Sequence, residues 1–189
     1  MAFHVSLVRG EVNFEALPVA KITNYPLEKA DYKPFAQASL CVSKELLWLR
    51  MWAFEVYTSP QSELRCVLYP FKNAGLALHI IAKAVDPTDV TACVVDCNGH
   101  ASSVAVSATP HNGEDLQGVY WGAQISLKLS ELEAVSPMCS LTAGEAFPGN
   151  FYKLRNDENY SHMGSFAPAD FPDKPFGKNS MDSFVLISY

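Results

Sequence analysis

Charged residues are scarce in this sequence, and basic residues are not in excess. Of 189 residues, 14 are Lys or Arg and 20 are Asp or Glu, which gives a formal net charge of −6. The basic residues are scattered along the chain rather than clustered. Nucleic acids and anionic membrane surfaces are bound through clustered Lys and Arg side chains, so we expect neither as a partner.

Long apolar runs are also absent. The longest, residues 75–82, contains His79, whereas a membrane-spanning helix needs about 20 consecutive apolar residues. The first nine residues have no basic segment ahead of an apolar one, as a signal peptide would have. The sequence therefore predicts a soluble, cytoplasmic protein, provided that no leader segment has been removed.

Cysteine and histidine lack the spacing of disulfide frameworks and metal sites. The five cysteines are an odd number, which indicates reduced thiols. Cys93 and Cys97 match neither the redox C-x-x-C spacing nor a zinc pair. The histidines lie far apart, and Asp86, Asp89 and Asp96 do not form an EF-hand pattern. We expect no metal and no cofactor.

Catalytic signatures are missing as well. The sequence contains no G-x-S-x-G, no H-E-x-x-H, no P-loop and no G-x-G-x-x-G. Glu55 could lie beside His162 in three dimensions and perform acid–base chemistry, which keeps an enzyme as an open alternative. The adjacent carboxylates Asp157 and Glu158 are typical of a solvated turn. The sequence predicts a non-catalytic protein.

Short apolar segments with strand periodicity make up most of the chain. In residues 46–55 both faces are largely apolar, which predicts a central strand covered on both sides. Asn98-Gly99 predicts a hairpin, and Ser130 with Glu133 matches a capping box for one helical turn. Further strands are expected at residues 5–8, 12–14, 19–22, 37–42, 64–71, 76–82, 90–96, 101–107, 119–129 and 183–188. About ten short strands with frequent turns predict one all-β domain over residues 1–189, an antiparallel β-sandwich of jelly-roll type.

Residues 149–177 show neither a helical nor a strand period. The segment is rich in Phe and Tyr and contains Pro168, Pro172 and Pro175. A disordered segment would have few aromatic residues, and long irregular segments of compact domains are often functional. We therefore expect an ordered C-terminal loop that covers one face of the sandwich as a lid.

Aromatic side chains near this loop and the central strand exceed the need of a core. Sugars present apolar C–H faces flanked by hydroxyl groups, so their sites combine aromatic platforms with a few planar polar groups. We predict a carbohydrate-binding site formed by Arg50, Trp52, Glu55, Trp121, Asn150, Tyr152, Lys153, His162 and Phe166. The alternative is that most of these side chains attach the loop to the sheet.

Several motifs resemble the carbohydrate-binding family 9-like proteins, which are related to the family 9 carbohydrate-binding modules. The resemblance is best over residues 147–189. Asn150 to Lys153 is similar to the family's Asn-Phe-Tyr-Lys element, and His162 to Pro168 is similar to its His-Tyr-x-Ser-Trp-x-Pro element, with Phe166 in place of Trp. Asp170 to Gly177 is similar to a shortened Asp-Phe-His-x-Pro-x-x-Phe-Gly element.

This resemblance implies a β-sandwich that binds a mono- or oligosaccharide through an aromatic and polar cleft without acting on it. A structural or protein-interaction sandwich that has lost sugar binding is the alternative.

Overall fold

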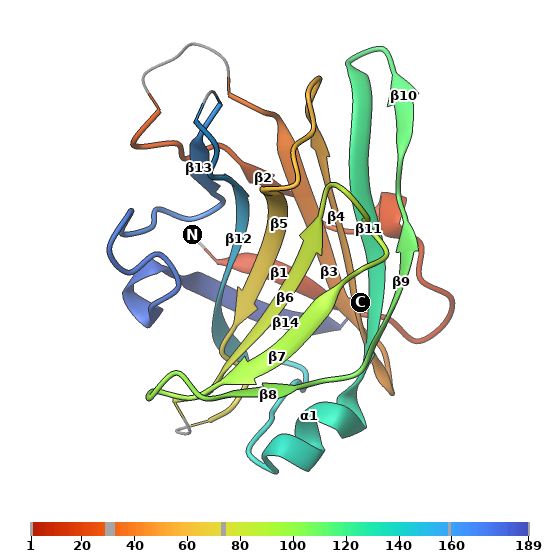
Figure 1. The fold of residues 1–189 in the computed structure, drawn as a ribbon. Coiled ribbons are helices and arrows are strands. Elements are labelled where there is room, and N and C mark those ends of the chain that lie inside the picture. Colours follow the sequence, from red (N-terminus) through yellow and green to blue (C-terminus); the bar gives the residue numbers. More distant parts are fainter. Residues whose placement is uncertain (1, 29–32, 73–74, 159, 189) are drawn as a thin grey trace.

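Fourteen β-strands, hydrogen-bonded into one sheet, dominate the computed structural model, which describes residues 2–28, 33–72, 75–158 and 160–188 (Figure 1). The strands are β1 (Phe3–Leu7), β2 (Ala20–Ile22), β3 (Ala36–Val42), β4 (Leu46–Phe54), β5 (Ser62–Leu68), β6 (Ala77–Lys83), β7 (Thr91–Val95), β8 (Ala101–Ser103), β9 (Val106–Pro110), β10 (Gly113–Asp115), β11 (Gly118–Lys128), β12 (Ala146–Arg155), β13 (His162–Ser165) and β14 (Asp182–Ser188). Helix α1 spans Leu129–Val135, and short 3₁₀ turns lie at Phe14–Ala16 and Lys178–Ser180. Within these described residues, no helix has the length and apolar character needed to cross a membrane.

The sheet follows the order β10-β11-β4-β3-β1-β14-β12-β5-β6-β7-β8, and it curls on itself. Strands β8 and β9 follow each other in the chain and connect the two ends of the sheet. Strand β8 pairs with β7 at one end, and β9 pairs with β11 near the other. In Figure 1, β5, β6 and β7 accordingly lie in a layer in front of β3, β1 and β14. A single large apolar cluster between these layers combines side chains from both, such as Leu40 and Met51 with Leu64 and Ile80.

The nearly all-β prediction is confirmed, but the expectation of a wholly antiparallel sheet is wrong. Strand β1 pairs in parallel with both β14 and β3, which makes the sheet mixed. Parallel neighbours need long crossover connections, and here β1 and β14 come from opposite ends of the chain. The period of a strand gives its exposed and buried faces but not its neighbours, so the sequence could not indicate this pairing.

Most of the predicted elements are present. Strand β4 is central, between β11 and β3, and its buried side chains Leu47, Leu49, Met51 and Ala53 alternate as expected. The Asn98-Gly99 hairpin joins β7 to β8, with Gly99 at φ 85°. Positive φ suits glycine because it has no Cβ.

Three local predictions are wrong. Residues 101–107 do not form one strand, because β8 ends at Ser103 and pairs with β7, whereas β9 begins at Val106 and pairs with β11. Residues 12–14 do not form a strand, because the Asn13 side chain accepts a hydrogen bond from the Glu15 amide and starts the 3₁₀ turn Phe14–Ala16. Helix α1 is present, but its N-cap is Lys128 rather than Ser130 and has no side-chain capping bond.

The predicted C-terminal loop is only partly irregular. Residues 146–155 form β12, which lies between β14 and β5, and residues 162–165 form β13, which pairs with β12. Strand β12 contains three buried polar residues, Asn150, Lys153 and Arg155. The sequence therefore lacks the alternation of apolar and polar residues that predicts a strand. Residues 156–158, 160–161 and 166–181 are irregular, apart from the 3₁₀ turn, and position 159 lies outside the described residues. Phe176 of the last segment packs edge-on against Tyr152 of β12 at 5.1 Å and lies 4.4 Å from the guanidinium carbon of Arg65 on β5.

Asn150 fastens this irregular segment to the sheet. Its Nδ2 donates to the carbonyl oxygens of Ala167 at 3.0 Å and Ser180 at 2.7 Å, and its Oδ1 accepts from the amides of Phe151 and Ala167. The side chain is fully buried. All of its hydrogen-bonding capacity is therefore spent inside the protein.

Replacing Asn150 by Ala is expected to lower the free energy of unfolding by about 2–4 kcal/mol, because several buried groups lose their partners together. Urea unfolding measures the change. Asn98→Ala, in an exposed turn, is the matched control. If the two variants were equally stable, Asn150 would not be the fastening point.

Candidate functional site

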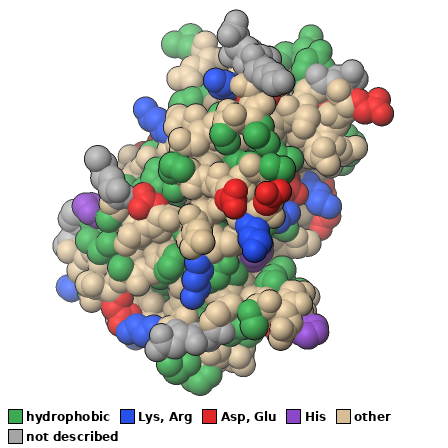
Figure 2. All heavy atoms as spheres, turned by 90° about the vertical axis from the view of Figure 1, so that its left-hand side faces the viewer, with side chains coloured by type: hydrophobic (Ala, Val, Ile, Leu, Met, Phe, Trp, Pro, Cys, Tyr) green, Lys and Arg blue, Asp and Glu red, His purple; other side chains and the backbone are tan. Residues whose placement is uncertain are grey.

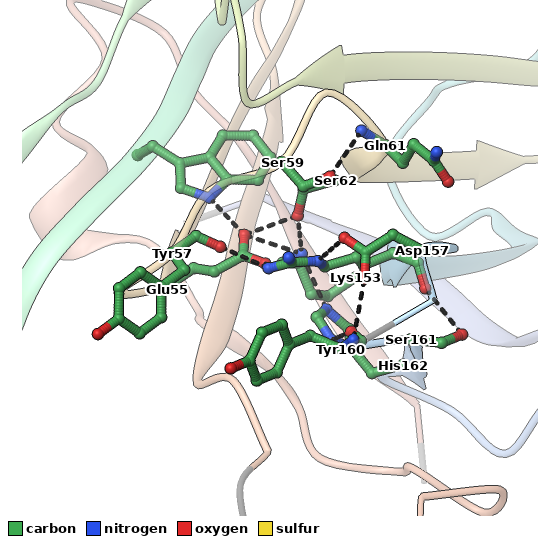
Figure 3. Close-up of polar contacts among 12 residues, drawn as sticks. Glu55, Tyr57, Ser59, Gln61, Ser62, Lys153, Asp157, Tyr160, Ser161 and His162 are labelled. Carbon is green, nitrogen blue, oxygen red and sulfur yellow. Dashed lines mark hydrogen bonds and ion pairs between the residues drawn. The ribbon is translucent and has the colours of Figure 1, made fainter.

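Four of the nine predicted site residues lie together where β4, β11, β12 and β13 approach one another. They are Glu55, Trp121, Lys153 and His162, and their exposed fractions are 3%, 5%, 0% and 6%. Figure 3 shows the polar groups of Lys153 and His162 close to the Glu55 carboxylate. Strand pairing brings them together, because β4 pairs with β11 and β12 pairs with β13.

The carboxylate of Glu55 is the centre of this cluster. Oε2 accepts hydrogen bonds from Ser62 Oγ at 2.6 Å and Trp121 Nε1 at 2.9 Å, and it lies 3.2 Å from Lys153 Nζ. Oε1 accepts from Arg155 Nη1 at 3.1 Å. Burial by itself would raise the pKa of Glu55, but Lys153 and the hydrogen bonds outweigh it and hold the pKa below its usual value. The group is therefore a buried carboxylate anion.

Lys153 and His162 complete the buried network. Lys153 Nζ donates to Ser62 Oγ at 2.5 Å and lies 3.0 Å from His162 Nε2. Burial lowers the pKa of Lys153 to about 8, opposed by the Glu55 charge. Burial and the Lys153 charge lower the pKa of His162 to about 4. At neutral pH Lys153 is thus charged, and His162 is neutral.

Arg155 joins the network to the surface, and sequence reasoning missed it. Its Nε donates to Asp157 at 2.5 Å, its Nη1 donates to Glu55 and to the Tyr57 carbonyl, and its guanidinium lies 5.2 Å from the centre of the Tyr160 ring. The available signal was its position two residues after Lys153, which places both side chains on one face of a strand.

A small open cavity lies beside this network. It has a volume of about 270 Å³ and is lined by Glu55, Val56, Tyr57, Arg155, Tyr160 and His162. Tyr57 and Tyr160 are 69% and 53% exposed, and their rings lie at an interplanar angle of 23° with centroids 6.4 Å apart. In Figure 3 the two rings lie beside each other on one side of the charged cluster. Sequence reasoning missed these tyrosines too, because they come from turns 103 positions apart.

Arg50 and Trp52 lie elsewhere, on the opposite face of β4. Arg50 pairs with Glu15 at 2.8 Å and packs over the rings of Phe14 and Trp52 at 4.9 and 5.0 Å. Trp52 also contacts His111 edge-on at 5.6 Å. Glu55 faces the core and these residues face outward, because side chains alternate along a strand. They do not line the cavity.

Asn150, Tyr152 and Phe166 are also outside the cavity. Tyr152 is fully buried and donates from its hydroxyl to the Pro175 carbonyl at 2.5 Å, so it fastens the irregular segment as Asn150 does. Phe166 packs in an aromatic cluster of the core with Phe3 at 5.4 Å. These three side chains have the attaching role that was the alternative to ligand binding.

The charges around the cavity are matched within the protein. Lys153 and Arg155 face Glu55 and Asp157. The face shown in Figure 2 likewise has acidic and basic side chains interspersed, with no large patch of one sign. In the described parts of the chain, no cluster of three or more His, Cys, Asp or Glu side chains could hold a metal ion.

Comparisons with known proteins place the fold among carbohydrate-binding structures. No family model and no curated protein matches the sequence. Among solved structures, a candidate carbohydrate-binding protein from Bacteroides uniformis has a TM-score of 0.75 at 12% identity, over 98% of both chains. A family 9 carbohydrate binding module from Caldicellulosiruptor kristjanssonii in complex with cellotriose has a TM-score of 0.58 at 12% identity, over 100% of this chain and 95% of that one. The glucose complex of such a module from the same organism has a TM-score of 0.58 at 11% identity, over 98% and 96%.

The predicted resemblance to family 9 modules is thereby confirmed at the level of the fold. At such low identity the likeness concerns the fold, and the bound sugars are ligands of those proteins.

Proposed function

We propose that this protein is a non-catalytic carbohydrate-binding domain that holds a sugar ring in the cavity lined by Tyr57 and Tyr160. The observation that carries the proposal is the pair of exposed, nearly parallel tyrosine rings beside a buried polar floor. Aromatic faces pack against the C–H faces of a sugar, and a few fixed polar groups orient its hydroxyl groups.

The polar floor is already ordered before a ligand arrives. Glu55 and Arg155 are held by hydrogen bonds to Ser62, Trp121 and Asp157. A fixed site loses little conformational entropy on binding. The cavity is slightly smaller than the roughly 300–1,000 Å³ of sites for drug-sized ligands, which suits a single ring or the end of an oligosaccharide.

The buried network supports binding rather than catalysis. A lysine beside a serine is a pairing that some hydrolases use for nucleophilic attack. Here both Ser62 and Lys153 have no exposed surface, and the Ser62 hydroxyl donates to Glu55. A substrate bound in the cavity would not reach the Ser62 oxygen.

Replacing Tyr160 by Ala is expected to weaken sugar binding by roughly 30-fold, as for an aromatic residue at the centre of a binding site. Glucose and cellotriose are the first probes because similar folds hold them, followed by a broad glycan panel. Fluorescence of Trp121, which bonds to Glu55 below the cavity, reports binding, and calorimetry gives the affinity.

Tyr120→Ala is the matched control for this experiment. It removes a half-buried tyrosine that packs with Phe54 and His111, which are not among the cavity residues. Equal losses of affinity in the two variants, or no binding by the folded protein across the panel, would overturn the proposal.

A protein-interaction domain is the second candidate. Val56 lines the cavity and is 73% exposed, and Leu116 and Val119 of the β10–β11 hairpin are exposed as well. Exposed apolar side chains that gather at one site are typical of protein contacts. A failed glycan panel would favour this candidate.

A further inference from the structure

Tyr160, one wall of the proposed sugar site, has its backbone held at both ends. Its amide donates to Asp157 Oδ1 at 2.9 Å, and its carbonyl oxygen lies 3.1 Å from His162 Nδ1. A carbonyl oxygen only accepts hydrogen bonds. His162 must therefore carry a proton on Nδ1 to hold Tyr160.

The other ring nitrogen of His162 faces a group that only donates. Nε2 lies 3.0 Å from the ammonium of Lys153, which has three donors and no acceptor. The other neighbours of the ammonium are acceptors as well: Ser62 Oγ at 2.5 Å, Glu55 Oε2 at 3.2 Å and, more distantly, the Leu154 carbonyl oxygen at 3.4 Å. Nε2 must therefore be unprotonated, and the neutral ring with its proton on Nδ1 is the form that satisfies both contacts.

We infer that Lys153 and His162 are positioning residues for the ligand: Lys153 fixes the Nδ1–H tautomer of His162, and His162 holds Tyr160 opposite Tyr57. The inference rests on the proposed function of the cavity. Lys153 is fully buried and cannot touch a ligand, so it acts through His162. In proteins, the hydrogen bond made by one ring nitrogen of a histidine commonly decides whether the other ring nitrogen carries a proton.

The surroundings of His162 keep this form at neutral pH. A proton on Nε2 would face the Lys153 ammonium at 3.0 Å, and the Arg155 charge also opposes it, whereas Glu55 favours it. The ring of Tyr25 lies edge-on to His162 at 6.3 Å. Burial and the two cations together disfavour the doubly protonated ring, in agreement with a pKa of about 4.

The tautomer can be measured without a ligand. Nitrogen-15 NMR of the histidine rings at pH 7 is expected to show His162 protonated on Nδ1 and unprotonated on Nε2, with the His162→Gln spectrum giving the assignment. In Lys153→Met the ring is expected to populate a second form. A wild-type ring protonated on Nε2 would overturn the inference, as would an unchanged ring in a folded Lys153→Met variant.

Matched variants at His162 test the positioning role. The Gln amide can accept from Lys153 through its oxygen and donate to the Tyr160 carbonyl through its nitrogen, whereas Leu can do neither. His162→Leu is expected to weaken cellotriose binding about tenfold, the effect of losing one buried hydrogen bond, and His162→Gln to restore most of that loss. Equal affinities of the two variants would contradict the inference.

Ring contacts between Tyr57 and Tyr160, measured by NMR without sugar, separate the two proposals. They are expected to weaken in His162→Leu and to persist in His162→Gln. If the ring contacts weaken in His162→Leu and persist in His162→Gln but no glycan binds, the proposed function fails and the positioning role of His162 stands. If Tyr160→Ala abolishes binding but His162→Leu leaves both binding and the ring contacts intact, the positioning inference fails alone.

Discussion

Glu55→Gln is expected to lower the free energy of unfolding by about 3–5 kcal/mol, the usual effect of removing one partner of a buried ion pair. The carboxylate faces Lys153 and Arg155, and the Lys153 side chain has no exposed surface. A neutral amide would leave a buried ammonium without its anion, and one end of the amide would present N–H groups to other donors. Chemical denaturation followed by circular dichroism measures the loss.

Two controls show whether the buried charge is the cause. Glu114→Gln makes the same chemical change at an exposed position and is expected to have little effect. The double variant Glu55→Gln, Lys153→Met removes both members of the pair and is expected to recover part of the lost stability, because neither charge is left alone. A double variant that loses the sum of the two single effects would show that the pairing is unimportant.

Acidification from pH 7 to 4.5 is expected to destabilise the protein by roughly 4 kcal/mol, about 2 kcal/mol from each of two buried histidines. Burial is the main cause that lowers the pKa of both His162 and His79 to about 4, and the charges of Lys153 and Arg65 add to it, respectively. An unfolded histidine has a pKa near 6.5. Between about pH 6.5 and 4 the unfolded chain therefore binds more protons, so stability falls as pH falls.

Urea unfolding at several pH values gives the slope of stability against pH. His162→Gln and His79→Gln are each expected to reduce this slope by about half, whereas His100→Gln, at an exposed position, is the control. Below about pH 4.5, the lowered pKa of Glu55 adds a further loss. A slope that is the same in all three variants would exclude the buried histidines as its cause.

One physical reason separates the residues of the proposed site that the sequence could indicate from those that it could not. Glu55 and Trp121 carried signals because Glu55 directly follows β4 and Trp121 lies in β11. Both strands alternate clearly, so the face of each side chain could be assigned. Lys153 was named within the motif that resembles family 9 modules. Tyr57 and Tyr160 carried none, because they come from turns, where no period assigns a direction to a side chain.

The charged residues of β12 illustrate the same limit. Lys153 and Arg155 in a strand indicate solvent exposure when only the sequence is read, since charged side chains are almost never fully buried unless paired. Their partner, Glu55, lies about a hundred positions earlier. Burial of these cations depends on a contact between segments that are distant in the chain, so it could not be predicted from the sequence.

The nearly all-β class, the central strand β4, the β7–β8 hairpin and the resemblance of the fold to family 9 modules could all be predicted from the sequence. These features depend on residues that are near neighbours in the chain. The parallel pairing of β1 with β14 and β3 and the meeting of Tyr57 with Tyr160 follow from the tertiary structure alone. Both depend on which distant segments become neighbours, and that choice is made by packing of the whole core rather than by local periodicity.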